Sequence, residues 1–596
     1  GLHQVDQLCI MESQKENNQR ERGREKFLLR IERRYMAFAC VNRKGLTLLT
    51  STALLLGFLT SPLPTVAHAA EKPGDTLIWA PCPKDAAKRS SRWNMQCSTF
   101  KVPLDYKNPT GKKITIMMSR IKATGRARGV ILNNPGGPGG SGLNLWSWML
   151  RTGSAIPLHH NFDLIAVQPR GLEHATPLRH CVNPDIADNN KNTKDKDLGT
   201  ITKTINDITD RSHNLRKKIT SKTSDVASKE YQKCVKDYKE LFEHVTTENT
   251  ARDFDMARQY LGQHTINFYG ASYGTWLGAV YATLFPEHID RLVLDSAVDP
   301  TGIWMDNFGS QGDMQRRRMY EMFDFFAARD NLYHLGDTPL KVYTKWYRII
   351  GREMQGPTTP RIGAPPAQIG DVPPQFKRNI QLYLTGYNLA RPLVDRIERA
   401  LHAWEAPNEK NEHNLWEITG LAFTSRTYWS QVAAYMQNPQ PKPLTKEEKE
   451  EKSVSDNVFR AVTCNENATV PKPLNLPATG IAYFMGADIF TLKNLIASSG
   501  IMCLGTRPNT KPINVTGAFL KNRPVVLQSI YDTQTPYAGG QKMAHAMNAY
   551  FVKADGGDHG VYVYDNPEAW ELVNNYYLRK PIVTRTKLPY ARVDEH

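Results

Sequence analysis

A serine between two glycines is the first place in this sequence where chemistry could occur. The run Gly270-Ala271-Ser272-Tyr273-Gly274 follows the apolar residues 266–269, and the residues after it repeat apolar side chains at helical spacing. A sharp turn from a strand into a helix needs small flanking residues and leaves the serine hydroxyl exposed. Ser272 is therefore a candidate nucleophile.

A nucleophilic serine needs a base, because its hydroxyl is hardly ionised at neutral pH. His559 is the favoured base, since it lies in the glycine-rich loop 556–560 directly after the apolar run 551–554. A loop at the end of a strand can present an imidazole to the edge of a sheet. His545 lies among methionines and alanines and is predicted to pack within a helix.

The acid that orients the base is expected at the end of an earlier strand. Asp532 meets this condition directly after residues 525–531, and Asp295 is its rival because it closes the run 292–294. We favour Asp532. In this arrangement the base takes the serine proton, and the acid holds the base and stabilises its charged form.

A glycine-rich loop supplies candidate donors for a developing oxyanion. Residues 135–142 follow a predicted strand, and the N–H groups of Gly137 and Tyr273 are the predicted oxyanion hole. The glycines at 137, 139 and 142 also match G-x-G-x-x-G, which could bind a dinucleotide. That interpretation requires an acid at the end of the next strand, where Gln168 stands instead, so no such cofactor is expected.

Short apolar runs alternate with longer helical patterns along most of the chain. This order predicts an α/β fold with a mostly parallel sheet flanked by helices. Between residue 300 and about residue 515 the strand rhythm disappears, which predicts a large helical cap over the carboxyl edge of the sheet. The expected divisions are therefore a first part of the core at 70–300, a cap at 301–515 and a second part of the core at 516–596.

The first 69 residues read as a leader rather than as part of the fold. Residues 1–35 show no apolar periodicity and look like a disordered leader or a misplaced start, and Met36 is a better start. After it come two basic residues, the apolar stretch 45–59 and Ala67-His68-Ala69, which is the order of a signal peptide. The stretch is shorter than the about 20 residues needed to span a bilayer. We expect export to a periplasm or the cell exterior.

The basic balance of the chain does not by itself identify a partner. The formal net charge is +17, and 66 Lys and Arg against 53 Asp and Glu remain after residue 69. The densest charged run, 446–452, is self-neutralising and predicts a solvated helix face, and the Lys-rich stretch 189–222 has no aromatic residues to stack bases. Nucleic acid is therefore not an expected partner.

The cysteines predict a disulfide framework. An even number of cysteines remains after the leader. Pairing in sequence order is favoured because each neighbouring pair then encloses one local segment of the chain. No spacing typical of a metal site is present, and no metal is expected. The six are Cys82, Cys97, Cys181, Cys234, Cys464 and Cys503.

Six motifs in order give the chain a resemblance to a known family. It resembles the exported tripeptidyl aminopeptidases and their prolyl-aminopeptidase relatives, serine peptidases of the α/β-hydrolase superfamily with a TAP-like C-terminal region. With weaker flanking similarity the resemblance spans about residues 79–577. The motifs lie at residues 134–142, 162–171, 267–281, 295–300, 532–536 and 557–561.

The resemblance implies the release of short peptides, often of three residues, from a free N-terminus. It also implies a triad of Ser272, Asp532 and His559, and a disulfide between Cys464 and Cys503. The chain departs from the family at Gln168, where relatives commonly have Asp, and at residues 172–176. These departures lie beside the oxyanion region and leave the triad intact.

An aminopeptidase needs an uncompensated carboxylate in a closed pocket to bind the substrate ammonium. In relatives the cap supplies it, and Glu466, next to Cys464, is the candidate, with Glu417 and Asp488 as alternatives. We therefore expect an exported serine exopeptidase that releases di- or tripeptides through an acyl-enzyme, without metal or cofactor. An ester hydrolase on the same fold and a non-catalytic peptide-binding protein are the alternatives.

Overall fold

The fold is described from a computed structural model. The structure describes residues 76–87, 93–179, 238–354, 359–402, 414–503 and 506–592. The expected leader and signal peptide, the Lys-rich stretch 189–222, Cys181 and Cys234 lie outside the described residues. All that follows concerns the described part of the chain.

The described residues form one mixed sheet of nine strands, in the order β1-β2-β3-β5-β4-β6-β7-β8-β9. The first three strands pair antiparallel, β3 also pairs antiparallel with β5, and β5, β4, β6, β7, β8 and β9 run parallel. The strands are β1 (Ala80–Pro81), β2 (Gln96–Pro103), β3 (Lys113–Ile121), β4 (Val130–Asn134), β5 (Asp163–Val167), β6 (Ile266–Ala271), β7 (Ile289–Asp295), β8 (Val525–Ser529) and β9 (Tyr550–Ala554).

The parallel strands confirm the predicted α/β fold. Each of the four apolar runs named from the sequence falls on one of β6 to β9, within a few residues at either end. Every residue of β4, β6 and β8 is buried. Such continuous burial arises because helices cover both faces of a parallel sheet.

Successive strand residues pack into two separate clusters, one on each face of the sheet. Phe268 belongs to the cluster under α7 and α8, and Tyr269 belongs to the cluster under α2, α3 and α20. This alternation follows from the two-residue period of a strand. The helices are α2 (Leu145–Thr152), α3 (Ile156–His159), α7 (Thr247–Tyr260), α8 (Tyr273–Leu284), α19 (Tyr537–Ala546) and α20 (Pro567–Tyr577).

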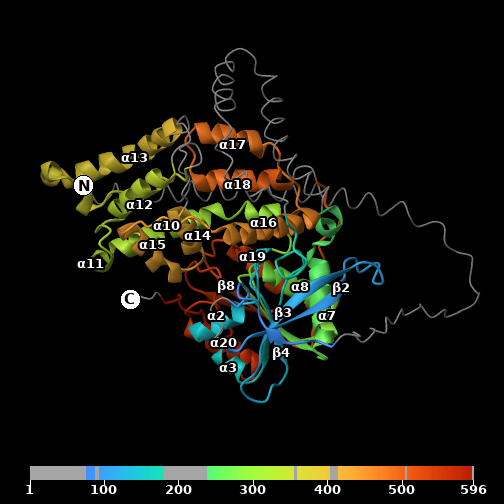
Figure 1. Ribbon diagram of the computed structural model, residues 1–596. Helices are drawn as coiled ribbons and strands as arrows, with labels where there is room; N and C mark the ends of the chain where they lie inside the picture. The colour runs from blue at the N-terminus through green and yellow to red at the C-terminus, as the bar shows by residue number, and fades with distance from the viewer. Residues whose placement is uncertain are drawn as a thin grey trace, which may run out of the picture. The chain divides into compact units, whose positions relative to one another are not determined.

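Between β7 and β8 the described residues contain helices and no strand (Figure 1). Six of these helices, α10, α11, α12, α14, α15 and α18, share a hydrophobic cluster of their own. The α-helices of this segment are α9 (Met305–Phe308), α10 (Gly312–Ala327), α11 (Asp330–Tyr333), α12 (Pro339–Glu353), α13 (Ile380–His402), α14 (Asn414–Thr424), α15 (Trp429–Gln437), α16 (Lys446–Glu466), α17 (Asn475–Phe484) and α18 (Ile489–Ser499).

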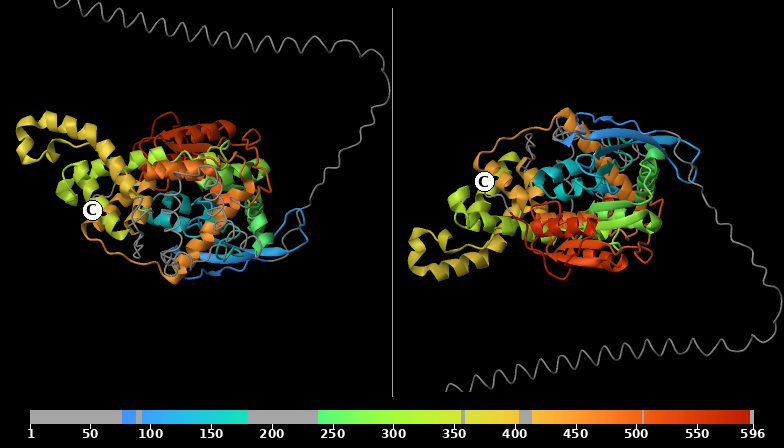
Figure 2. Two further views of the ribbon diagram at one scale, coloured as in Figure 1. Left: turned by 90° about the horizontal axis from the view of Figure 1, so that it is seen from above. Right: turned by 90° about the horizontal axis from the view of Figure 1, so that it is seen from below.

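Helix α16 belongs to the core as much as to the cap. Its first turns carry the charged run 446–452, which is mostly exposed, and Thr445 and Glu448 form a capping box at its start. Further along, Val454, Val458 and Ala461 pack into the cluster on the α7 and α8 face of the sheet. In contrast, α13 lies at the outer end of the helical segment in all three views (Figures 1 and 2).

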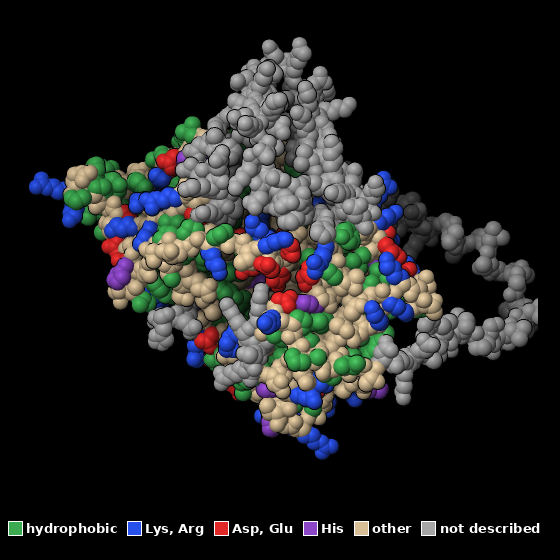
Figure 3. Space-filling view, in the orientation of Figure 1, with side chains coloured by type: hydrophobic (Ala, Val, Ile, Leu, Met, Phe, Trp, Pro, Cys, Tyr) green, Lys and Arg blue, Asp and Glu red, His purple; other side chains and the backbone are tan. Residues whose placement is uncertain are grey.

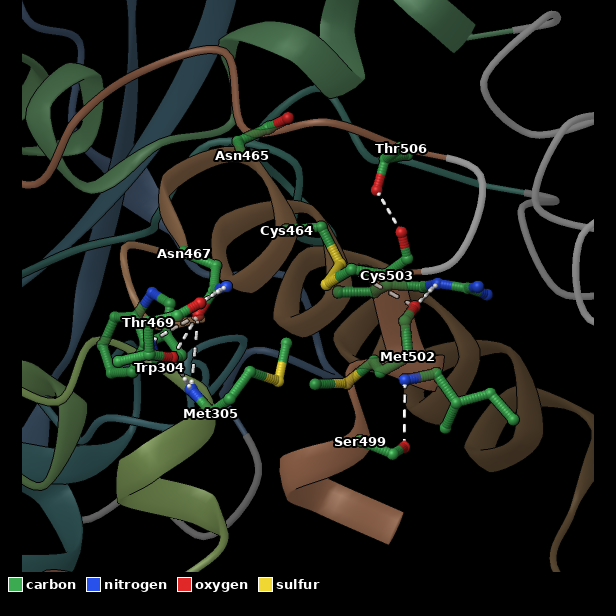
Figure 4. Close-up of a disulfide and its surroundings, with 12 residues drawn as sticks. Trp304, Met305, Cys464, Asn465, Asn467, Thr469, Ser499, Met502, Cys503 and Thr506 are labelled. Atoms are coloured by element: carbon green, nitrogen blue, oxygen red, sulfur yellow. Dashed lines mark hydrogen bonds between the residues drawn. A yellow bond between two sulfur atoms is a disulfide. The ribbon is translucent and has the colours of Figure 1, made fainter. Parts of the chain in front are cut away.

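Two of the predicted disulfides are present. Cys82 pairs with Cys97, and Cys464 pairs with Cys503 across a sequence separation of 39 residues. The second bond joins α16 to the short turn after α18 (Figure 4). It therefore closes the chain around α17 and α18 onto the helix that reaches the core.

Replacing both Cys464 and Cys503 by serine is expected to lower the free energy of unfolding by about 2–4 kcal/mol, because the bond removes loop entropy from the unfolded chain. Urea denaturation of the variant and the parent under non-reducing conditions measures this. The matched control is Cys82→Ser with Cys97→Ser, whose shorter loop of 15 residues predicts a smaller loss. A double variant at 464 and 503 as stable as the parent would contradict the expectation.

Candidate active site

Ser272 lies on the turn between β6 and α8. Its φ of 57° is in the left-handed region, which a non-glycine residue adopts at a cost. The turn is crowded, since a Cβ on Gly136 would lie 2.7 Å from the Cβ of Ser272 and 2.9 Å from the nitrogen of Tyr273. The glycine-rich loop therefore lies directly against Ser272, with the N–H of Tyr273 beside it.

The loop after β9 brings His559 to the side chain of Asp532. The Nδ1 of His559 lies 2.9 Å from Oδ1 of Asp532, whose side chain is fully buried. The same carboxylate accepts hydrogen bonds from the N–H groups of Gln534 and Thr535, the hydroxyl of Thr535 and the amide of Gln528. Because the carboxylate can only accept, Nδ1 carries a proton and leaves Nε2 free to act as a base.

Asp295, the rival acid, faces a different group. Its carboxylate accepts hydrogen bonds from the N–H groups of Val561 and Tyr562 at 2.7 and 2.8 Å and from the hydroxyl of Tyr269 at 2.8 Å. Complete burial raises the pKa of Asp295, and these donors oppose the rise. Asp295 thus fixes the backbone just after His559, and it is Asp532 that contacts the imidazole ring.

The helical segment also holds the His559 loop. The N–H of His559 donates to the carbonyl of Thr424 at the end of α14, and the hydroxyl of Thr533 donates to the carbonyl of Phe423. Arg318 of α10 forms an ion pair at 2.5 Å with Asp558, the residue before His559, and both side chains are buried. Burial raises the pKa of Asp558, and the charge of Arg318 opposes this.

The glycine-rich loop is held on both sides. A Cβ on Gly139 would lie 2.5 Å from the carbonyl oxygen of Ser455 on α16, and the hydroxyl of Ser455 donates to the carbonyl of Gly139. Gln168 accepts a hydrogen bond from Ser141 and donates to the carbonyl of Glu173. Gln168 therefore links this loop to the loop after β5. Gly137, the predicted donor, stands next to Gly136 in the same turn.

Glu466 lies at the end of α16 with 3% of its surface exposed. Its carboxylate accepts hydrogen bonds from the backbone N–H and the hydroxyl of Thr247 and from the indole N–H of Trp304. Burial raises its pKa to about 7, with these donors opposing the rise. The main influences on its pKa besides burial come from Thr247, Trp304 and Trp276, none of which is a cation.

Two hydrogen bonds connect Glu466 to the residue after Ser272. The hydroxyl of Thr247 donates to Glu466 at 2.6 Å, so it accepts from the hydroxyl of Tyr273 at 2.9 Å. Trp304 is fixed in turn, because its backbone N–H donates to the side-chain oxygen of Asn467, one residue beyond Glu466 (Figure 4). The carboxylate is thus connected, through Thr247, to the phenol hydroxyl of Tyr273.

The other residues considered from the sequence lie elsewhere. Glu417 is exposed on α14, and Asp488 caps α18 and forms two hydrogen bonds with Arg316, which help lower its pKa against the opposing effect of burial. His545 is helical as predicted but exposed, because it lies on the outer side of α19. The described residues hold no cluster of potential metal ligands and no helix suited to crossing a bilayer.

Comparison with family models now identifies the fold. The model described as "alpha/beta hydrolase fold" matches residues 129–345, and the model described as "TAP-like protein" matches residues 492–587. These matches confirm the predicted α/β-hydrolase fold. The first match includes Ser272, and the second includes Asp532 and His559. Both halves of this hydrolase core therefore carry their own match, on either side of the helical segment.

Curated relatives of this α/β hydrolase include peptidases and an esterase. A tripeptidyl aminopeptidase of Streptomyces coelicolor is 34% identical over 49% of this chain and 51% of its own length. The serine protease Hip1 of Mycobacterium tuberculosis is 26% identical over 83% and 87%, and a protein of the same organism named carboxylesterase B is 25% identical over 89% and 95%. The chain thus spans about half the length of the first of these relatives.

Among solved structures, an esterase from Thermogutta terrifontis matches this chain. The match covers 81% of this chain and 98% of the esterase, at 11% sequence identity and a TM-score of 0.30.

Several residues that contact the predicted site were missed by sequence reasoning, among them Thr247, Trp304 and Arg318. Thr247 and Trp304 hold Glu466, and Arg318 holds the residue before His559. Arg318 is 240 positions from Asp558. The one signal in the sequence is Asp558, which is adjacent to the predicted base. An acid that is buried at such a position needs a cationic partner, but the sequence does not show which Lys or Arg that partner is.

Replacing Arg318 by methionine is expected to lower kcat and to destabilise the fold by about 3–5 kcal/mol, because Asp558 then keeps a buried charge without its partner. Urea denaturation and steady-state kinetics with an activated ester measure the two effects. Adding Asp558→Asn should recover much of the stability.

The matched control is Arg316→Met on the same helix. Its guanidinium is partly exposed and pairs with Asp313 and Asp488, away from His559. We expect a loss of about 1 kcal/mol or less and an unchanged kcat. If both substitutions lowered stability and kcat equally, Arg318 would contribute only to the stability of α10 and would not position the His559 loop.

Proposed function

We propose that this protein is a serine exopeptidase that removes short peptides, of two or three residues, from the free N-terminus of its substrates. The contact between His559 Nδ1 and the buried carboxylate of Asp532 carries the proposal, together with the position of Ser272 on its strained turn. Peptidase names among the relatives support the substrate class.

In this proposal Ser272 is the nucleophile. His559 takes its proton through Nε2 while Oγ attacks the scissile carbonyl, and Asp532 stabilises the imidazolium that forms. The backbone N–H groups of Gly137 and Tyr273 stabilise the oxyanion, an interaction typically worth about 3 kcal/mol for each donor. His559 then protonates the leaving amine, and water attacks the acyl-enzyme by the reverse route.

Glu466 is the proposed site for the substrate ammonium. Its carboxylate is buried, held by uncharged donors and connected to Tyr273 through Thr247. In such surroundings Coulomb attraction to an ammonium is screened far less than in water. A peptide bound there by its N-terminus would place a carbonyl only a few residues along near Ser272, which favours release of a short fragment.

Hydrolysis of carboxylic esters is the second candidate. The same nucleophile, base and oxyanion donors serve both reactions. The observation in its favour is the relative named carboxylesterase B, which aligns with a larger share of this chain than the aminopeptidase does.

We also propose export with cleavage after Ala69. The support is the order of basic residues, apolar stretch and small residues before that position.

Three chromogenic substrates distinguish these functions: a free-amine tripeptide, its N-blocked form and a short acyl ester. We expect hydrolysis of the free-amine peptide and a loss of about 10⁴-fold or more in Ser272→Ala. Asp532→Asn should lose about 10⁴-fold in kcat, since it leaves the imidazole in the wrong tautomer. Asp295→Asn, the matched control, should lose far less.

Other outcomes would redirect the assignment. Equal cleavage of blocked and free peptides would exclude the aminopeptidase, and turnover of the ester alone would favour the second candidate. Equal background from the parent and Ser272→Ala would indicate a peptide-binding protein without catalysis. Full activity of Asp532→Asn would move the acid to Asp295.

The pKa of Glu466, raised to about 7, predicts a pH-dependent KM. As the pH falls through 7 the carboxylate gains a proton and loses its attraction for the ammonium, which stays charged below its own pKa of about 7.7–8.0. The KM of the free-amine peptide should therefore rise as the pH falls from 7 to 6, where the peptide amine stays protonated and the charge of Glu466 is lost. Glu466→Gln should have a high KM at every pH.

The acyl ester is the control for this measurement, because it has no ammonium for Glu466 to bind. A KM that rises equally for ester and peptide, or a pH-dependent KM retained in Glu466→Gln, would contradict the assignment of Glu466.

A further inference from the structure

Helix α13 has its apolar side turned outward. Six of its large apolar side chains have exposed fractions between 41% and 82%. At 100° per residue all six fall within one sector of the helix. They are Leu382, Leu389, Leu393, Val394, Ile397 and Leu401, and are called here the α13 face.

The polar residues of α13 point inward instead. Asp395 is the one residue of the helix that is fully buried, and it accepts a hydrogen bond from the N–H of Ala364. Asn388 exchanges two hydrogen bonds with the backbone of Ala367, and Arg399 donates to the carbonyl of Gly486. These contacts fix the rotation of the helix, so the α13 face cannot turn toward the cap without breaking them.

A contiguous exposed apolar surface of this kind usually marks an interaction site. Figure 3 shows hydrophobic side chains gathered at the end of the cap that α13 forms. The neighbouring helix α17 adds Ile481, and Met485 follows directly after its end; both are more than half exposed. It meets α13 where Arg396 donates to the carbonyl of Met485.

The exposed charges at the border of the α13 face are basic. Lys377 and Arg378 lie just before the helix, and Arg396 lies beside the apolar sector. The partly exposed acid Glu398 pairs with Arg391. An apolar helix face bordered by Lys and Arg is the pattern of helices that lie in the surface of an anionic bilayer.

The same charges disfavour a second copy of this chain as the occupant. If two copies met through the α13 face, the basic border of one copy would approach the basic border of the other. Like charges at a close interface are repulsive.

We propose that the α13 face docks this protein peripherally on an anionic lipid surface. The helix lies flat, with its leucines among the acyl chains and its basic border at the headgroups. The hydrolase core stays outside the bilayer, since α13 lies at the outer end of the helical segment (Figure 2).

Co-sedimentation of the full chain with vesicles tests the proposal. We expect binding to phosphatidylglycerol-containing vesicles, weaker binding to pure phosphatidylcholine vesicles and loss of the difference at high salt. Leu389→Gln with Leu393→Gln should weaken binding to both by about ten-fold or more, since each change removes buried apolar area. Lys377→Glu with Arg378→Glu should weaken only the binding to anionic vesicles.

The matched control is Phe519→Gln with Val583→Gln, which changes two equally exposed apolar residues outside α13. It should bind vesicles like the parent, and all three variants should hydrolyse soluble substrate like the parent. Absence of vesicle binding by the parent, or equal loss in the control, would overturn the proposal.

Two further results would also overturn it by identifying another occupant. A concentration-dependent dimer in sedimentation velocity, without vesicle binding and abolished by the leucine changes, would indicate a second copy. A clear fall in melting temperature on making the leucine changes, again without vesicle binding, would show that another part of this chain covers the face.

Discussion

The end of β7 is the point on which the rest of the site depends. The carbonyl of Asp295 accepts the N–H of Ser272, and its carboxylate accepts two N–H groups from the loop that carries His559. The next residue, Ser296, donates its N–H to β8 and accepts the N–H of Gly560. Asp295 and Ser296 thus set the spacing between three strand ends. The buried carboxylate of Asp295, held by two N–H groups and the hydroxyl of Tyr269, leaves little freedom there.

The helical cap also holds the loops that carry Asp532 and His559 in place. Backbone carbonyls of Phe423 and Thr424 and the guanidinium of Arg318 meet the two loops that carry Asp532 and His559. The helical segment is therefore part of the proposed catalytic machinery and more than a cover. Because these contacts are buried, a displacement of α10 or α14 would be transmitted to the imidazole, as expected for closely packed interiors.

Much of the fold could be predicted because buried parallel strands leave a clear pattern in the sequence. The runs ending near Ser272, Asp295 and Asp532 were each located within a few residues of their strands, and the order of the parallel strands places their ends at one edge. The partners of these residues could not be predicted. Asp295 and Asp532 look alike in sequence, since each follows an apolar run, and only tertiary contacts show which one meets an imidazole. The outward face of α13 was equally hidden, because periodicity shows that a helix is amphipathic without showing which side it buries.

Helix α16 has a consequence for how the length of a released peptide could change during evolution. It contacts the glycine-rich loop through Ser455 and ends at Glu466. Under the proposed function, a single helix therefore both supports the oxyanion loop and provides the site for the substrate amine. One turn of helix advances about 5.4 Å, whereas one extended residue of peptide spans about 3.3–3.6 Å. Adding or removing a turn would alter the separation by more than one substrate residue. Related hydrolases could therefore differ in the fragment they release by discrete steps and not by gradual drift.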